Sequence, residues 1–475
     1  MQYSIIPYSD IDLGNRIDAE YFQPTYLEME ERLKSLNGTP LRNFCSITGS
    51  AFYPAATHLY EIGDLPFIRC VDCIPHPIVT TRQNSSFEKI PTYFANEQKN
   101  IKTLSKGEIV ITKVGSPCYA SIIHDLDVVA LSRTVLGLKS IHGVDPYYLV
   151  AYLRSKYGFS QLVRERELTI QYQLTLDRVG SVLIFKPENE LLEQKIAQSF
   201  LLYEAAIKHS ESLFHKAQSL LLSELGLANW QPKHRLNFVR NSNEVEKAER
   251  IDAEYFQPKY DEIVNAIKSY AGGWDRLGNL VVMKKSVEIG SSEYLDEGIP
   301  FVRVSNLSPF ELSEEKFMSD KLYAELAKHQ PQKGEILLSK DGSPGIAYHL
   351  REKPEKMIVS GGILRLKLKN QRINADYLAL VLNSLLVQEQ ANRDIGGSII
   401  YHWRPDQIKE VVIPIFGKEK QDEIQQKVSE SFALRAKSKS LLEAAKRAVE
   451  MAIEESEEKA LAWLAKQIEK SGIEL

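Results

Sequence analysis

The nonapeptide RIDAEYFQP occurs twice in this chain, at Arg16–Pro24 and again, letter for letter, at Arg250–Pro258. Chance does not produce nine identical residues at an offset of 250 − 16 = 234 in one chain of 475 residues. The nonapeptide therefore predicts that the sequence around each copy is duplicated as well.

Other segments of the two halves match in the same order. They are PFIR with PFVR (66–69, 300–303), KGEIVITKVGSP with KGEILLSKDGSP (106–117, 333–344), DPYYLVAYLRS with NADYLALVLNS (145–155, 374–384) and VGSVLIF with IKEVVIP (179–185, 408–414). The offset between partners drifts by only a few residues, as insertions in loops would produce. The chain is thus a tandem duplication with a period of about 230 residues, much longer than the repeat of a solenoid.

Composition is that of a folded protein with several domains. A length of 475 residues exceeds one usual domain, and 43% hydrophobic and 26% charged residues are ordinary values. No run of about 18 apolar residues predicts a membrane helix, and the start MQYSIIPYSDID lacks the regions of a signal peptide. We therefore expect a cytoplasmic protein without membrane contact.

The net charge of −4 is uninformative about nucleic acid, because acidic helices can mask a basic face.

The cysteines provide a test of a metal or redox site. All four lie in the first copy, at Cys45, Cys70, Cys73 and Cys118, and Cys70 and Cys73 have half the spacing of a zinc ribbon or a redox pair. The matching positions of the second copy hold Val281, Val304, Leu307 and Gly345. A half that folds without these thiols does not need a metal held by them, so we expect reduced thiols and no metal site.

Each half is predicted to be a mixed α/β body followed by a long helix. Apolar runs rich in β-branched residues, such as LPFIRCVD (65–72) and GEIVITKV (107–114), predict strands. The runs YYLVAYLRSKYGFSQLVR (147–164) and YLALVLNSLLVQEQ (377–390) predict helices, because apolar residues recur every three or four positions.

A long helix is predicted at the end of each half. One apolar stripe runs from Leu192 to Leu221 and ends at Gly226, and a second, from Ile424 to Ile453, is weaker around Arg435–Lys439. A helix of about 35 residues is roughly 50 Å long, and a single apolar seam has only its duplicate to pack against. We therefore predict an antiparallel coiled coil between halves related by a pseudo-twofold axis.

These patterns give a complete division of the chain. We predict a first α/β domain over 1–187, a first long helix over 188–227, a linker over 228–249, a second α/β domain over 250–418 and a second long helix over 419–475.

The nonapeptide is interpreted as scaffold or as a dock for a partner, because a specificity surface would differ between two divergent copies. Asp18 and Asp252 are expected to cap a helix whose first turns contain the aromatic residues, and Pro24 and Pro258 to bend or end it. The residues assigned to this role are Arg16, Asp18, Tyr21, Phe22, Arg250, Asp252, Tyr255 and Phe256.

Other segments diverge between the copies, namely 39–100 against 273–332 and 164–178 against 393–407. Different surfaces on two similar bodies predict recognition of two different targets. Arginine follows an apolar strand in both halves, lysine precedes a Gly-Ser turn that can approach phosphate, and QYQ (171–173) and YHW (401–403) carry different polar edges and aromatic rings suited to bases.

The candidate DNA-binding residues follow from this comparison. They are Arg69, Lys113, Ser116, Arg133, Gln171, Tyr172 and Gln173 in the first half, and Arg303, Lys340, Ser343, Ser398, Tyr401, His402 and Trp403 in the second. Two other interpretations stay open. Each cation can be an ordinary surface charge, and Tyr172, Tyr401 and Trp403 can be core aromatics.

Motifs of common enzymes are missing from the sequence. There is no G-x-x-x-x-G-K-[ST], G-x-G-x-x-G, H-E-x-x-H or G-x-S-x-G, and no Asn/Asp-Pro-Pro-aromatic tetrad of an amino-methyltransferase. We therefore predict a chain without a catalytic site of its own.

The whole chain resembles the specificity subunit of Type I restriction-modification systems. The resemblance lies in the R-I-D-A-E-Y-F-x-P-x-Y openings (16–26 and 250–260), in the K-G-E-I strand with its Gly-Ser-Pro turn, and in the repeated order of domain and long helix. It implies a non-catalytic DNA reader in which two target-recognition domains each recognise half of a bipartite, gapped site in double-stranded DNA. The helices would set the gap, at most about 15 base pairs.

The same resemblance implies partners and their cofactors. Two methyltransferase subunits would dock on the helices and bring S-adenosylmethionine, and restriction or translocase subunits would bring ATP and Mg²⁺, while this chain would bind no cofactor. Alternatives are the related specificity subunit of a Type II system and a coiled-coil scaffold with two protein-binding domains and no role in DNA binding. An enzyme with an unrecognised site is a third possibility.

Overall fold

The computed structural model describes residues 4–6, 18–52, 58–74, 76–115, 118–167, 172–396 and 401–474. The chain divides into two compact units. Unit 1 contains Met1–Lys208 together with Leu434–Leu475, and unit 2 contains His209–Ala433. Unit 1 is therefore built from both ends of the sequence.

Unit 1 is built on two sheets and a small strand pair. The first sheet has the order β2-β10-β7-β8-β4 and the second β5-β3-β9-β6, while β1 pairs with β11. The bounds are β1 Thr39–Pro40, β2 Ser46–Gly49, β3 Leu65–Ile68, β4 Ile78–Val79, β5 Lys89–Ile90, β6 Thr103–Ser105, β7 Ile109–Thr112, β8 Ala120–Ile123, β9 Val128–Leu131, β10 Val135–Lys139 and β11 Leu183–Ile184. Strands β7 and β8 are buried along their whole length, which explains their continuous apolar sequence.

Unit 2 repeats this topology with fewer strands. Its sheets have the orders β13-β19-β16-β17 and β15-β14-β18, and β12 pairs with β20. The bounds are β12 Trp274–Arg276, β13 Val281–Lys285, β14 Ile299–Val302, β15 Phe317–Met318, β16 Ile336–Ser339, β17 Ala347–His349, β18 Ile358–Val359, β19 Ile363–Leu368 and β20 Val412–Pro414. The parallel pairing of β3 with β9 recurs as β14 with β18. The duplication seen in the sequence thus extends to strand order and strand direction.

Shorter helices connect the strands of both units. In unit 1 they are α1 Pro24–Ser35, α2 His58–Glu61, α3 Cys70–Cys73, α4 Thr92–Glu97, α5 Pro146–Arg154, α6 Lys156–Arg164 and α7 Leu176–Ser181; in unit 2 they are α9 Ser242–Ala248, α10 Pro258–Lys268, α11 Leu277–Leu280, α12 Asp320–Leu326, α13 Ala375–Leu382, α14 Leu385–Asp394 and α15 Pro405–Glu410. The continuous helix predicted over 147–164 is divided at Ser155, which has an extended backbone.

The prediction for the nonapeptide helix was wrong. Asp18 does cap, with its Oδ1 accepting from Tyr21 N at 3.0 Å, but it closes a turn rather than a helix. Helix α1 begins at Pro24 and α10 begins at Pro258, so each proline starts a helix instead of ending one. Proline suits this first position, where its missing N–H would have no partner in the helix and its fixed φ is already helical.

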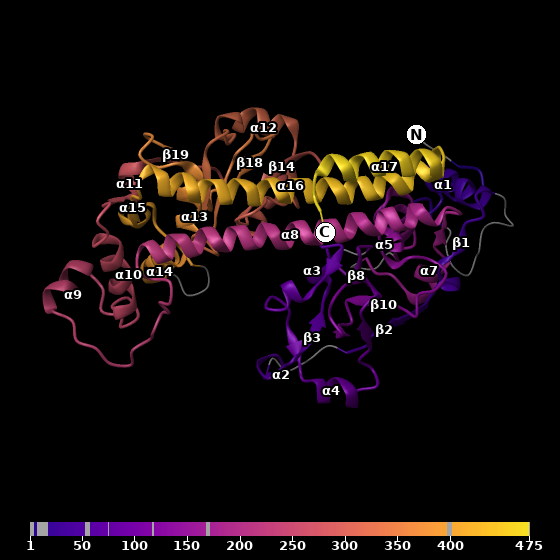
Figure 1. Cartoon of the computed structure of the whole chain (residues 1–475), viewed down its shortest axis with the longest axis horizontal. Helices are drawn as coiled ribbons and strands as arrows, with labels where there is room; N and C mark the ends of the chain where they lie inside the picture. Colours follow the sequence, from indigo (N-terminus) through magenta and orange to yellow (C-terminus); the bar gives the residue numbers. More distant parts are fainter. Residues whose placement is uncertain are drawn as a thin grey trace. The chain divides into compact units, whose positions relative to one another are not determined.

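Two long helices run side by side, α8 (Glu190–Glu224) and α16 (Lys418–Glu454), as Figure 1 shows. In unit 1, Leu192 and Ile196 of α8 share a core with Val449 and Ile453 of α16. In unit 2, the later part of α8 packs with the early part of α16, and Lys420 Nζ lies 3.7 Å from a carboxylate oxygen of Glu224. The pair is therefore antiparallel, as predicted.

The middle of this pair is polar, at the place where the seam was predicted to be weak. Four serines are fully buried there or nearby, at Ser199, Ser210, Ser431 and Ser438. Within unit 2, Ser431 Oγ lies 2.8 Å from Ser210 Oγ and donates to Ser210 O at 2.8 Å. Each of these buried serine hydroxyls thus bonds to another serine or to a backbone carbonyl, as buried polar groups require.

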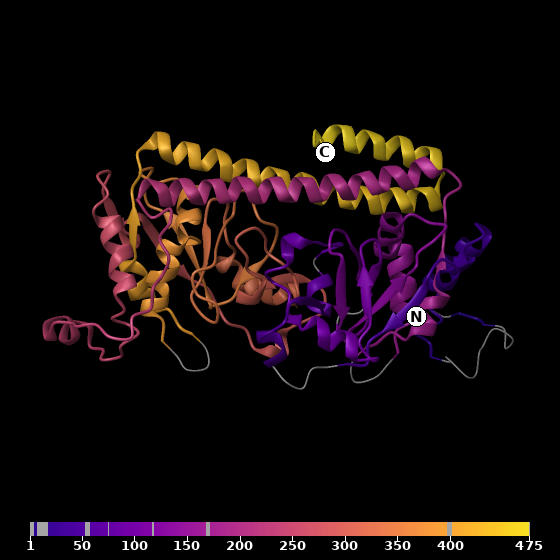
Figure 2. The same cartoon turned by 60° about the horizontal axis from the view of Figure 1, so that its bottom comes forward.

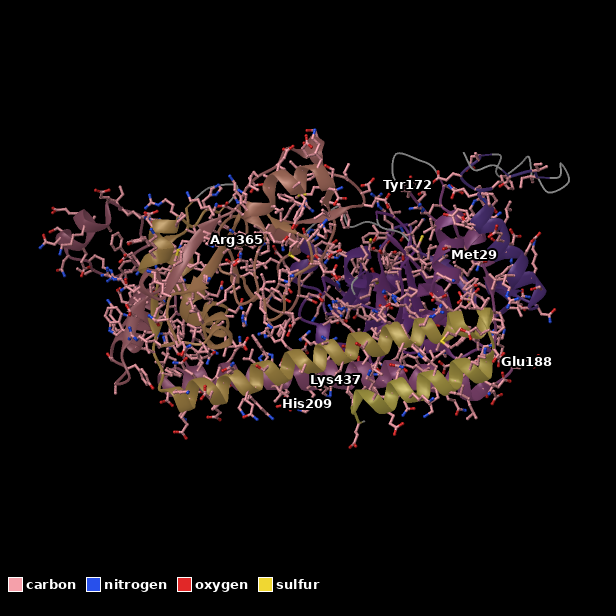
Figure 3. The ribbon with its side chains drawn as sticks, turned by 90° about the horizontal axis from the view of Figure 1, so that it is seen from above. Met29, Tyr172, Glu188, His209, Arg365 and Lys437 are labelled. Atoms are coloured by element: carbon pink, nitrogen blue, oxygen red, sulfur yellow. The ribbon has the colours of Figure 1, made fainter. Side chains whose placement is uncertain are left out.

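The second long helix is shorter than predicted. The segment predicted as one helix over 419–475 forms α16 and a separate helix, α17 (Glu457–Ser471), which turns back within unit 1 (Figure 2). Ser456 caps α17, and Ala460 and Leu464 join the core that contains Leu192. The Glu457 carboxylate accepts from Glu188 N at 3.0 Å, at the residue labelled in Figure 3 just before α8. No helix among the described residues is long and apolar enough to cross a membrane.

Candidate nucleic-acid interface

In unit 1, the turn after β7 is joined to the end of the divergent loop. Val114 forms an isolated β-bridge with Gln173, and Leu174 N donates to Lys113 O at 3.1 Å. Lys113 N in turn donates to Thr134 O at 2.8 Å. Sequence-predicted residues that are about 60 positions apart are therefore held together by backbone hydrogen bonds.

Unit 2 builds the same junction after β16. Asp341 bridges His402, Trp403 N donates to Lys340 O at 2.8 Å, and Lys340 N donates to Gly362 O at 2.9 Å. Gly342 N adds a hydrogen bond to Tyr401 O at 2.9 Å. Because only backbone atoms make these bonds, the side chains of the two loops are free to differ.

The two junctions correct the predicted alignment of the loops by one residue. QYQ (171–173) was set against YHW (401–403), but the bridges pair Gln173 with the position of His402. Tyr172, Gln173 and Leu174 therefore match Tyr401, His402 and Trp403. Side chains of an extended chain alternate between its two faces, so a shift of one residue exchanges the outward and inward positions.

Burial agrees with the corrected alignment. Tyr172, labelled in Figure 3, is 40% exposed and Tyr401 is 53% exposed, whereas Leu174 is fully buried and Trp403 is 1% exposed within the core of unit 2. The two tyrosines therefore have a surface to offer a base. The ring of Trp403 has none, and for it the interpretation as a core aromatic holds; its prediction as a DNA contact is not kept.

The two predicted arginines occupy equivalent positions and both bond to carboxylates. Arg69 lies 3.4 Å from Asp72 and 3.4 Å from Glu88, and Arg303 lies 2.7 Å from Glu315. Each side chain is about one-third exposed. A phosphate would have to compete with these carboxylates for either guanidinium.

The two predicted lysines differ in their surroundings. Lys340 Nζ forms an ion pair with Asp341, whose other carboxylate oxygen lies 2.7 Å from His402 Nδ1. Burial raises the pKa of Asp341, but the hydrogen bonds from Lys340 and His402 outweigh it and hold that pKa below its ordinary value. In unit 1, Val114 stands where Asp341 would be. Among the described residues, the Lys113 ammonium has no carboxylate partner.

The remaining predicted residues divide into two groups. Ser343 and Arg133 are exposed, Ser343 in the turn after β16 and Arg133 just after β9. Arg16, Ser116, Gln171 and Ser398 lie outside the described residues.

The nonapeptide of unit 1 lies beside the divergent loop, which the sequence did not indicate. Tyr21, Arg164, Arg166 and Tyr172 line one cavity of about 10 Å³. The Arg164 guanidinium lies 4.1 Å from the centre of the Tyr21 ring, and that of Arg166 lies 4.2 Å from the centre of the Tyr172 ring. Burial and the neighbouring Glu165 carboxylate, which accepts from Tyr21 Oη at 2.8 Å, raise the pKa of Tyr21 to about 12.

Unit 2 has a larger, more open version of this cavity, with a volume of about 790 Å³. Arg250 and Tyr255 of the nonapeptide line it together with Arg393, His402 and Arg404. Arg250 pairs with Asp252 at 2.7 Å and lies 4.5 Å from the centre of the Tyr255 ring. Residues predicted as scaffold and residues predicted as DNA contacts therefore share one site in each unit.

Asp252 and Phe256 complete the account of the second nonapeptide. Asp252 caps the turn by accepting from Tyr255 N at 3.1 Å, as Asp18 does in unit 1. Phe256 is 9% exposed and packs edge-on against Tyr255 at 4.9 Å, and Phe22 packs the same way against Tyr21 at 5.1 Å. These contacts are structural, so the nonapeptide has both a supporting part and a part that lines the cavity.

The cysteines show no arrangement for metal binding. Cys45, Cys73 and Cys118 are buried free thiols, and burial raises the pKa of Cys45 and of Cys118 to about 12. In the part of the chain that the structure describes, no group of three or more His, Cys, Asp or Glu residues is placed to hold a metal ion.

Comparison with known proteins gives similarities at the level of solved structures only. No family model matches the chain, and no curated protein matches it. The crystal structure of the S subunit of a Type I restriction-modification system from M. genitalium is 13% identical, with 90% of this chain and 95% of that chain covered and a TM-score of 0.35. The HsdS subunit from Thermoanaerobacter tengcongensis is 16% identical, with coverages of 90% and 95% and a TM-score of 0.27. Values this low do not transfer a function.

Proposed function

We propose that this chain is the DNA-recognition (specificity) subunit of a Type I restriction-modification complex. Each unit would read one half of a bipartite, gapped target in double-stranded DNA. The chain would have no catalytic site of its own and would act in the cytoplasm. It would bind two methyltransferase subunits through α8 and α16, and restriction or translocase subunits would complete the complex.

One observation carries the proposal. Both units hold the end of a divergent loop against a matched strand turn by the same backbone bonds, yet present Tyr172 and Gln173 in one case and Tyr401 and His402 in the other. Gln and His offer different hydrogen-bonding edges to bases in the major groove, and exposed tyrosines can stack on bases or insert between them. A common frame with different outward residues is what two half-sites of different sequence require.

The surroundings of the loops support a nucleic-acid ligand. Arg166 lies near the loop of unit 1, and Arg393 and Arg404 lie near that of unit 2. Arginine and lysine provide the phosphate contacts that position a protein on DNA, and base edges then specify the sequence. The net charge of the whole chain is no obstacle, since the local field at the interface determines binding.

The proposal implies a division of labour with partner subunits. The methyltransferase subunits would bring S-adenosylmethionine, and the restriction or translocase subunits would bring ATP and Mg²⁺. This chain would need none of these to recognise its target.

A map of methylated adenine tests the proposal in the source organism. Single-molecule sequencing with and without this gene should show one gapped, two-part motif whose methylation disappears on deletion. A chain carrying the unit 1 loop residues exchanged for those of unit 2 should change one half of that motif and leave the other half intact. If methylation persists at every motif while the partner subunits are expressed, the proposal fails and the coiled-coil scaffold becomes the better hypothesis. A contiguous motif would also contradict it.

A further inference from the structure

In unit 2, two amide side chains join the start of α13 to the start of α16. Asn374 caps α13 by accepting from Tyr377 N at 2.7 Å, and its backbone N–H donates to Gln421 Oε1 at 3.0 Å. The Nε2 of Gln421 donates to Arg372 O at 2.9 Å and to Phe416 O at 2.8 Å. Gln421 is 5% exposed, and both ends of its amide are hydrogen-bonded, as buried polar groups require.

Unit 1 builds the same junction from two carboxyl groups. Asp145 matches Asn374 and caps α5, and its backbone N–H donates to Glu193 Oε2 of α8 at 2.9 Å. Glu193 thus stands in the place of Gln421. It is 9% exposed, and its other oxygen, Oε1, has no hydrogen-bond partner among the described residues. An ionised Glu193 therefore leaves a buried acceptor unpaired where the second repeat has a donor, which is costly.

Carboxylates predominate around the start of α8. Asp145 lies beside Glu193, Glu190 lies in the same helical turn, and Lys186, which precedes the helix, provides a positive charge. Glu457 of α17 accepts from the two backbone N–H groups just before α8. Burial raises the pKa of Glu193, and the charge of Asp145 adds to this effect. The hydrogen bond from Asp145 N acts the other way but leaves the pKa of Glu193 above its ordinary value.

We propose that Glu193 is a buried proton-binding site, and that its ionisation loosens the junction between α5 and α8. The protonated carboxyl has a donor at Oε1, as Gln421 has at Nε2 in unit 2. Ionisation removes this donor and places a second negative charge beside Asp145. Tyr148 of α5 also senses the charge of Glu193, but burial raises the pKa of this tyrosine, so it stays neutral over the same pH range. The proposal concerns the fold of unit 1 and does not rest on the proposed function.

Protonation of Glu193 should stabilise unit 1 toward acid pH. A glutamate in an unfolded chain has a pKa of about 4.3, and the folded-state pKa of Glu193 lies above its ordinary value. The stabilisation is then fully present below the unfolded-state pKa and is lost as the pH rises through the folded-state pKa. The start of α8 and α5 should therefore open more easily at about pH 8 than at about pH 5. Gln421 has no proton to lose, so the junction of unit 2 lacks this response.

Amide hydrogen exchange of the full chain at several pH values, corrected for the intrinsic exchange rate, tests the proposal. In the wild type, the protection of peptides from α5 and from the start of α8 should fall severalfold between about pH 5 and about pH 8. Glu193→Gln, which copies the second repeat, should remove most of this fall. Asp145 and His124, which is bonded to Tyr147 of α5, account for what remains. Glu190→Gln, which neutralises an exposed carboxylate in the same turn, should leave the fall in place.

Three outcomes overturn the proposal. One is an equal fall of protection with pH in the wild type and in Glu193→Gln. Another is failure of Glu193→Gln to fold, as judged by circular dichroism and gel filtration, because the neutral side chain is proposed to be the stable form. The third comes from Asp145→Asn, which keeps a capping residue and removes the charge beside Glu193. This variant should move the fall to lower pH, and a fall at the same pH as in the wild type contradicts the proposal.

Discussion

The two units have different side chains at one matching place, where the first helix after the main sheet packs on a long helix. In unit 2, the Arg351 guanidinium lies 3.3 Å from the centre of the Phe432 ring and 2.6 Å from Asp376 Oδ1, which also lies 2.7 Å from His349 Nδ1. Asp376 is 5% exposed, so its carboxylate is a buried partner of Arg351 and His349. Removing a buried partner of this kind leaves a charge without compensation.

Unit 1 has a tyrosine and a histidine at the matching place. Tyr147 replaces the aspartate, and its Oη lies 2.7 Å from His124 Nδ1 while its ring packs on Phe200 at 5.8 Å. The cation of unit 1 is instead Arg154, which binds carbonyl oxygens. Duplication has therefore kept the backbone of the two units and changed where each holds its buried charge.

The largest effect that tests this comparison is expected from Asp376→Ala. It leaves Arg351 buried without its carboxylate and should cost about 3–5 kcal/mol of the stability of unit 2. Tyr147→Phe, the matched change in unit 1, loses the hydrogen bond to His124 and should cost about 1 kcal/mol. Amide hydrogen exchange of peptides from α13 and α5 measures both opening free energies. Equal costs would show that the cluster is not held by its charges.

The same cluster makes the two units respond differently to acid. Burial raises the pKa of Asp376, but the hydrogen bond from His349 and the charge of Arg351 outweigh it and lower that pKa below its ordinary value. A carboxyl with a lowered folded-state pKa stabilises the fold above the unfolded-state pKa of about 3.9 and loses this contribution as the pH falls through the folded-state pKa. Hydrogen exchange at decreasing pH should therefore show α13 opening before α5. Asp376→Asn should remove most of the difference.

Exchanging the outward loop residues sharpens the comparison at the proposed DNA interface. Gln173→His together with His402→Gln should transfer preferences between the two half-sites, with about 1–3 kcal/mol of discrimination for each base pair affected. Selection from DNA with one randomised half-site at a time, using the complete complex, measures this. Trp403→Phe serves as the control and should leave the preferences unchanged, because the indole is buried. If the base preferences of both half-sites are unchanged in the double exchange, neither Gln173 nor His402 contacts the bases.

A glycine gives a smaller difference between the units. Gly345 has φ +93° and Cys118, at the matching position, has φ +85°. A Cβ at Gly345 would lie 2.6 Å from Gln388 Nε2, which donates to Gly345 O at 2.8 Å. Gly345→Ala should therefore cost about 1–3 kcal/mol from strain, whereas Cys118→Ala, which already has a Cβ there, should cost about 1 kcal/mol. Thermal unfolding measures the stability lost by each variant. A Gly345→Ala variant that is more stable than Cys118→Ala, each relative to the wild type, would contradict the strain expected at Gly345.

The smallest expected effect concerns the two lysines of the strand turns. Lys113→Gln should lower DNA affinity for all sequences and reduce the salt dependence by about one phosphate contact. Lys340→Gln should do less, because Asp341 already offsets its charge. Fluorescence anisotropy at several salt concentrations measures how steeply the DNA affinity of each variant falls with salt. A larger effect at Lys340 would mean that Asp341 releases the lysine when DNA binds.

Repetition made much of the fold predictable. The nonapeptide, the K-G-E-I strands and the helical stripes each occur twice, so a pattern in one half could be compared with its copy in the other. The matching strand orders of the two units agree with the duplication. Helix boundaries were less predictable. Pro24 was expected to end a helix and instead starts α1, because the residues before it form a capped turn that the sequence does not distinguish from a helical one.

Many residues of the candidate site could be predicted from the sequence, but their arrangement in space could not. The alignment of the divergent loops depends on the bridges from Val114 to Gln173 and from Asp341 to His402. The bridged residues differ between the two halves, so the sequence does not reveal that they correspond. The contact of Arg164 with Tyr21 joins residues 143 positions apart, so the link between the nonapeptide and the loop is tertiary only. Such contacts have no periodic pattern from which they could be inferred.

Unit 1 is composed of residues from both ends of the chain, and this sets the order in which it can form during synthesis. The apolar face of α8 that includes Leu192 and Ile196 packs against Val449 and Leu464, which the ribosome adds more than 240 positions later. Until then, this face lacks the part of its packing that α16 and α17 provide. A chain that stops early in α16 would lack part of the core of its first unit as well as the end of its second. The fold thereby makes the core of unit 1 depend on translation of the chain through unit 2 and beyond.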